Sequence, residues 1–77
     1  MTMTAQQFRA TLASTIGKNL RATRSRMGLT QEQTAERVGI TIEFYGRMER
    51  GQALPSLKTL VRMADIMKTT PNGLLKR

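Results

Sequence analysis

Residues 29–51, LTQEQTAERVGITIEFYGRMERG, contain two short amphipathic segments that meet at Gly39. Thr30, followed three residues later by Gln33, forms a capping box and predicts a helix that ends just before this glycine. Thr41 is a suitable N-cap for a second helix that ends before residue 51. Because glycine adopts a positive φ without a Cβ clash, Gly39 allows a sharp turn between the two. The stretch therefore predicts two helices joined by a tight turn.

Upstream of this unit, apolar residues follow a strict four-residue step that predicts one long helix. We expect this helix to begin after Thr4 and to run to about Met27, where Gly28 stops it. As an alternative, the first third of this segment is a frayed arm and not part of the helix. No segment alternates apolar and polar residues over the length of a strand, so no sheet is expected.

Two further helices are expected downstream. Ser56 can cap a fourth helix over residues 57–67, and Thr70 followed by Pro71 opens a short fifth helix. The fourth helix is expected to bury an apolar stripe of Leu57, Leu60, Val61 and Ala64. The fold class predicted from these elements is all-α, a compact five-helix bundle, with residues 1–13 as an N-terminal extension and residues 14–77 as one domain.

The composition restricts the function. The 77 residues hold one small domain, with 13 Lys and Arg against 5 Asp and Glu, and no acidic residue precedes Glu32. A surface of this kind attracts polyanions. Cysteine and histidine are absent, which argues against disulfides, most zinc sites and the commonest general base. We expect no enzyme activity, cofactor, metal or small-molecule ligand, and a cytoplasmic protein without a membrane segment.

The order and spacing of several residues resemble a known family, the Cro and phage-repressor type of helix-turn-helix, or XRE family. The resemblance covers about residues 16–75, and the residues that carry it are Leu29-Thr30-Gln31-Glu32, Ala35, Gly39, Arg47, Glu49-Arg50-Gly51, Pro55-Ser56-Leu57, Leu60 and Ala64. It implies a lambda-repressor-like bundle and a sequence-specific DNA-binding transcriptional regulator. The partner would be double-stranded DNA, with the third helix in the major groove. The protein would then work at the nucleoid.

The resemblance also implies which residues contact DNA. The base-reading positions would be Thr41, Ile42, Glu43, Phe44 and Arg47, of which Arg47 can pair with guanine O6 and N7. Gln31 heads the second helix, where free amides and the helix dipole favour a phosphate. The full set of expected phosphate-binding residues is Thr30, Gln31, Arg50, Gln52, Ser56 and Lys58.

Three further expectations follow from the resemblance. The positions of Arg24 and Glu49 imply a partly buried structural ion pair between the first and third helices, the alternative being a solvent-exposed pair worth about 0 to 1 kcal/mol. Thr34 stands where a leucine is usual, and Tyr45 where an isoleucine or valine packs. We expect Tyr45 to bury its ring and to place its hydroxyl at the edge of the core.

A second class of function stays open. An acid between two apolar residues is an unusual reading set, so Ile42 and Phe44 could instead form an exposed apolar patch of a protein-interaction module, such as an adaptor, antirepressor or antitoxin-like partner. Such a protein partner would cover the third helix and displace DNA.

A homodimer on a palindromic site is expected, because one small domain covers few base pairs. Its contacts would come from Leu74 and Leu75, or from Phe8 and Leu12 in the N-terminal extension. The alternative is that Phe8 and Leu12 fold back on the core.

Overall fold

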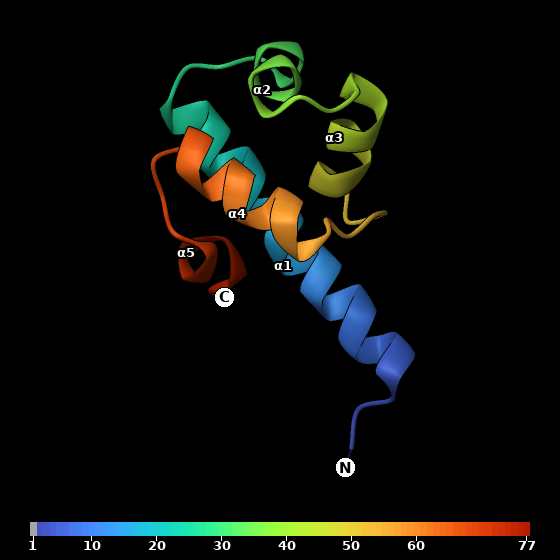
Figure 1. Cartoon of the computed structure of the whole chain (residues 1–77). Coiled ribbons are helices and arrows are strands. Elements are labelled where there is room, and N and C mark those ends of the chain that lie inside the picture. Colours follow the sequence, from blue (N-terminus) through green and yellow to red (C-terminus); the bar gives the residue numbers. More distant parts are fainter. Residues whose placement is uncertain (1) are drawn as a thin grey trace.

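The computed structural model describes residues 2–77 and consists of helices joined by short turns (Figure 1). The helices are α1 (Ala5–Arg26), α2 (Gln31–Val38), α3 (Ile42–Glu49), α4 (Leu57–Ile66) and α5 (Pro71–Leu75). No strand occurs among the described residues, which confirms the predicted all-α class. None of these helices combines the length and the apolar character needed to cross a bilayer.

Local capping fixes where each helix begins. In every case a side-chain hydroxyl accepts a hydrogen bond from the backbone N–H three residues later, and the residues concerned are Thr4, Thr30, Thr41, Ser56 and Thr70. A capped start of this kind satisfies one of the free amides of the first turn. The capping box at Thr4 shows that the first third of α1 is helix rather than an arm.

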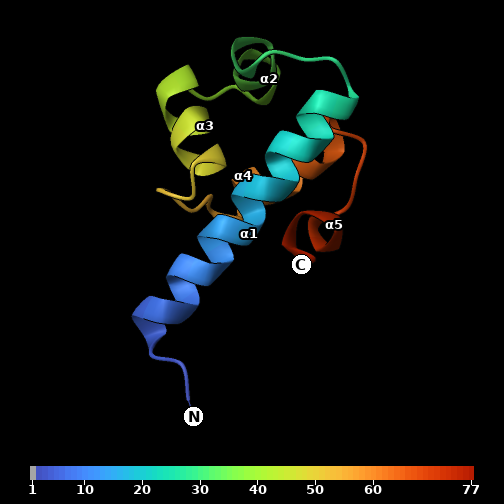
Figure 2. The same ribbon diagram turned by 180° about the vertical axis from the view of Figure 1, so that it is seen from behind.

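The five helices surround one core, with α3 and α5 on opposite sides of α1 in both views (Figure 2). The N-terminal half of α1 projects beyond the bundle and accounts for the elongated shape of 40 × 22 × 21 Å. Gly39 adopts φ +85°, as expected, and redirects the chain between α2 and α3. Ala35, which is 2% exposed, lies in the core beside this turn.

The prediction of the buried stripe on α4 is wrong in part. Leu60 and Ala64 are buried, but Leu57 is 75% exposed and Val61 49% exposed. The core instead receives Met63 and Met67, whose flexible side chains fill the space between helices. The face of α4 that is buried therefore differs by a rotation about the helix axis from the face that its aliphatic residues predict.

Burial also corrects the expected dimer contacts. Leu74 is fully buried in the core, so it cannot contact another molecule, and Leu75 is partly buried. In the projecting half of α1, Leu12 packs against the core, whereas Phe8 remains 60% exposed. The alternative in which both residues fold back is thus correct for Leu12 only.

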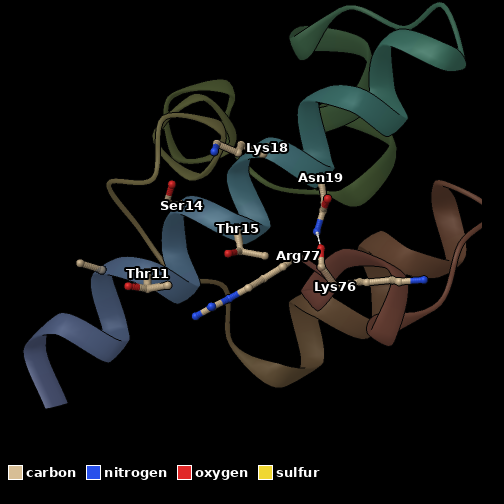
Figure 3. Close-up of a pocket in the computed structure, with 8 residues that line it drawn as sticks. Thr11, Ser14, Thr15, Lys18, Asn19, Lys76 and Arg77 are labelled. Atoms are coloured by element: carbon tan, nitrogen blue, oxygen red, sulfur yellow. Dashed lines mark hydrogen bonds between the residues drawn. The ribbon is translucent and has the colours of Figure 1, made fainter. Parts of the chain in front are cut away.

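The end of the chain is held by a contact that the sequence does not indicate. The Asn19 amide donates a hydrogen bond to the Leu74 carbonyl oxygen at 2.8 Å. It donates a second one to the Lys76 carbonyl oxygen at 2.7 Å, which is drawn in Figure 3. These bonds fix the end of α5 and the residue after it against α1. A hollow lined by polar and basic residues, including Thr15 and Arg77, lies beside this contact.

Candidate nucleic-acid interface

The third helix presents one face to the core and the other to solvent. Tyr45 and Met48 are fully buried, whereas Glu43 and Arg47 are exposed. Since residues three and four positions apart share a helix face, Glu43 and Arg47 lie together, with Arg50 beyond the end of α3 on the same side. This open face is formed by charged side chains.

The start of α3 contains the remaining residues expected to read bases. Thr41 is exposed and its hydroxyl caps the helix by accepting from the Phe44 N–H at 3.1 Å. Ile42 is 40% exposed. Phe44 is only partly exposed and packs against the core, so it does not form an exposed apolar patch with Ile42. The apolar surface available to a protein partner at the start of α3 is therefore smaller than the protein-interaction alternative expects.

An ion pair fastens the end of α3 to α1. Arg24 Nε lies 2.6 Å from one Glu49 oxygen and Arg24 Nη2 lies 3.1 Å from the other. Their side chains are 17% and 3% exposed, so this pair is partly buried. Arg24 Nη1 also donates to the Leu29 carbonyl at 2.9 Å, which ties the same guanidinium to the turn before α2.

Gln31 extends this pair into a network that joins three helices. Its Nε2 donates to the same Glu49 oxygen that accepts from Arg24 Nη2, at 3.0 Å. Burial by itself would raise the pKa of Glu49, but the hydrogen bonds from Arg24 and Gln31 lower it below its usual value. The carboxylate also raises the pKa of Arg24. Both groups therefore remain charged at neutral pH.

Tyr45 departs from the sequence-based expectation. Its side chain is fully buried rather than reaching the edge of the core, and the hydroxyl makes no hydrogen bond within residues 2–77. Burial raises the pKa of the phenol, and the neighbouring Glu49 carboxylate raises it further. Thr34 is also fully buried, but its hydroxyl is satisfied by the Thr30 carbonyl at 2.9 Å.

The expected phosphate-binding residues are distributed over the starts of α2 and α4 and the loop after α3. The hydroxyls of Thr30 and Ser56 are engaged in capping their own helices. Arg50 Nε donates to Gln52 Oε1 at 3.2 Å, so these two side chains are linked. Lys58 is exposed in the first turn of α4.

Arg50 and Gln31 converge above Gly46. A Cβ atom at Gly46 would lie 3.1 Å from Arg50 Nη1 and 3.6 Å from Gln31 Oε1. Arg21, which the sequence did not single out, lines a shallow pocket of about 160 Å³ together with these two side chains and the Arg24–Glu49 pair. The only sequence signal for Arg21 is its place among the basic residues before Glu32.

Residues 15–75 match the family described as a helix-turn-helix domain. The chain belongs to this family. Among curated relatives, it is 38% identical over 60 residues to an SPbeta prophage-derived uncharacterized HTH-type transcriptional regulator of Bacillus subtilis, covering 78% of this chain and 56% of the relative. It is 32% identical over 62 residues to the cryptic phage CTXphi transcriptional repressor RstR of Vibrio cholerae, covering 80% and 55%.

A solved structure of a controller protein has the same fold. The restriction-modification controller protein C.AhdI from Aeromonas hydrophila superposes with a TM-score of 0.76 at 32% identity, covering 80% of this chain and 94% of that chain. This chain spans little more than half the length of the two curated relatives. The segment before residue 15, which includes the projecting part of α1, lies outside the family match.

Proposed function

We propose that this helix-turn-helix protein is a DNA-binding transcriptional regulator that places α3 in the major groove. The observation that carries the proposal is the orientation of α3: its inner face is fastened to the core and to Arg24, which leaves Glu43 and Arg47 open to a ligand. A rigid helix with one free face suits the major groove. The formal net charge of +8 favours a polyanion, and relatives named as transcriptional regulators support the same reading.

Within this proposal, two kinds of contact have separate roles. Arg47 reads guanine through its planar fork, Glu43 accepts from cytosine N4, and Ile42 contacts thymine methyl groups. Thr41 and the open part of the Phe44 ring complete the reading surface. Phosphate contacts come from the starts of α2 and α4 and from the loop after α3, through Thr30, Gln31, Arg50, Gln52, Ser56 and Lys58. No step in this function requires catalysis.

We further propose that two copies bind a palindromic site in the cytoplasm, at the nucleoid. A twofold axis presents two reading helices to two half-sites. Phe8 supports a contact through the projecting part of α1, because it is the large apolar side chain of that segment that remains exposed. A protein partner that covered α3 would compete with DNA for the same face.

Selection of bound sequences from random duplexes, repeated at two salt concentrations, tests the proposal. We expect a palindromic consensus and a slope of log K against log salt near −4 per chain, if roughly four phosphates are neutralised per half-site. Sedimentation of the selected complex should give two chains per duplex. Absence of duplex binding at low salt would overturn the proposal, and enrichment of a single half-site would overturn the palindromic dimer.

A further inference from the structure

The pocket that Arg21 lines is basic in spite of the glutamate it contains. Its lining has three arginines, Arg21, Arg24 and Arg50, against one acid, Glu49, and Gln31 completes it. The Glu49 oxygens accept from Arg24 and Gln31, and this side chain is 3% exposed. The negative charge is thus already neutralised and covered. An anion that enters the pocket meets the remaining cations.

Two of these cations have donors to offer. All three guanidinium nitrogens of Arg24 are engaged, with Glu49 and with the Leu29 carbonyl. Arg50 uses Nε for Gln52, which leaves its terminal nitrogens free of that bond. Arg21 is exposed and forms no ion pair within residues 2–77. Arg21 and Arg50 therefore face the pocket from α1 and from the end of α3 with donors available.

We propose that this pocket holds one phosphate of the DNA backbone, with Arg21 and Arg50 as its two cationic partners. The inference rests on the proposed function and adds Arg21, from outside the two helices of the helix-turn-helix unit, to the interface. Arginine suits this position because its fork can donate two hydrogen bonds to one phosphate. The Arg24–Glu49–Gln31 network forms the floor of the pocket and holds its two sides together.

The test compares Arg21→Gln with Arg26→Gln, a matched variant on the same helix. Both remove one positive charge, but Arg26 lies roughly 140° further around the helix axis and hydrogen-bonds Thr23. Binding to a mixed-sequence duplex is measured across a salt series. We expect Arg21→Gln to reduce the magnitude of the salt slope by about 0.9 per chain, so that its affinity loss is roughly threefold greater at 50 mM than at 200 mM salt.

In the same series, Arg26→Gln should keep the wild-type slope. An equal change in both variants would show a general effect of net charge and overturn the proposal, as would an unchanged slope in Arg21→Gln. Arg21→Lys should recover most of the slope, because the charge is restored. Thermal unfolding of each variant shows whether the fold is retained.

A titration with inorganic phosphate separates this inference from the proposed function. Amide signals of Gln31 and of Arg50 should shift in the wild-type protein and not in Arg21→Gln. If the wild-type protein binds no duplex, the proposed function and the DNA assignment of the pocket both fail. If free phosphate shifts these signals while Arg21→Gln leaves the duplex slope unchanged, the pocket binds a free anion and the DNA assignment alone is overturned.

Discussion

Gly17 of α1 and Met48 of α3 approach so closely that a Cβ atom at Gly17 would stand 2.6 Å from the Met48 carbonyl oxygen. The Glu49 carbonyl oxygen would be equally near. The two helices therefore cross with backbone against backbone at the point where the ion pair also joins them. The orientation of the proposed reading helix depends on this contact, because the obstructing atoms belong to the main chain and cannot rotate away.

Gly17→Ala should destabilise the protein although alanine favours helix by about 1 kcal/mol relative to glycine. The added methyl group would push α3 from α1, at a cost of about 1 to 3 kcal/mol, measured by urea unfolding. Gly46→Ala is the control, since its methyl group would meet the movable end of Arg50 at 3.1 Å. We expect a much smaller effect there, and equal stability of the two variants would contradict the backbone contact.

Glu49→Ala should lower the free energy of unfolding by about 2 kcal/mol or more, because Arg24 would lose its partner in a partly buried position. Glu36→Ala removes an exposed acid from α2 and should change stability by less than about 0.5 kcal/mol. Denaturant unfolding of both variants provides the comparison. A loss below about 0.5 kcal/mol for Glu49→Ala would place the pair among exposed ones that contribute little.

The lowered pKa of Glu49 predicts a pH dependence of stability. A carboxyl group whose pKa is lower in the folded state stabilises the fold at pH values above its ordinary pKa of 4.5, and this contribution disappears as pH falls through the folded-state pKa. The stability difference between wild type and Glu49→Gln should therefore be largest near neutral pH and shrink in acid. If this stability difference stays constant at pH values well below 4.5, the ionised carboxylate of Glu49 is not its cause.

Tyr45→Phe should leave the protein as stable as the wild type or more stable, by up to about 1 kcal/mol. The variant removes a buried hydroxyl that has no hydrogen-bond partner within residues 2–77 and keeps the ring that fills the core. Thermal and denaturant unfolding measure the change. A loss above about 1 kcal/mol would mean that the hydroxyl donates to Glu49 in solution.

Arg47→Ala and Lys58→Ala should affect DNA binding in different ways. In Arg47→Ala, loss of a bidentate contact to guanine should reduce the free-energy difference between the correct and incorrect base at one position by about 1 to 3 kcal/mol. In Lys58→Ala, loss of a phosphate contact should weaken binding to all sequences alike and reduce the magnitude of the salt slope by about 1. Both variants are measured against the selected duplex and single-base variants of it. Uniform weakening by Arg47→Ala would remove this residue from the reading set.

Features set by near neighbours in the chain were predictable from the sequence. The caps at Thr30, Thr41 and Ser56 and the left-handed turn at Gly39 each depend on atoms a few residues apart, and all are present in the structure. They are sufficient to mark where α2, α3 and α4 begin and where α2 ends. The family resemblance then supplied the arrangement of these helices in space.

Features set by distant neighbours were not predictable in the same way. The buried face of α4 depends on which helices cover it, so Met63 and Met67 replaced Leu57 and Val61 in the core. The partial exposure of Phe44 and the complete burial of Tyr45 depend on how the whole bundle packs. The pocket at Arg21 combines side chains from α1, α2 and the end of α3, and no spacing in the sequence indicates that they meet.

The hydrogen bond from Gln31 to Glu49 affects the entropy of ligand binding. A flexible side chain at the head of α2 would lose rotamer freedom when it met a ligand, and that loss would weaken the complex. In this protein, Glu49 already restrains Gln31 when no ligand is present. Preorganisation at this position means that the entropy of Gln31 is lost when the protein folds and not when it binds. A variant that releases Gln31 would therefore bind its ligand with a more unfavourable entropy, even if it kept every contact to that ligand.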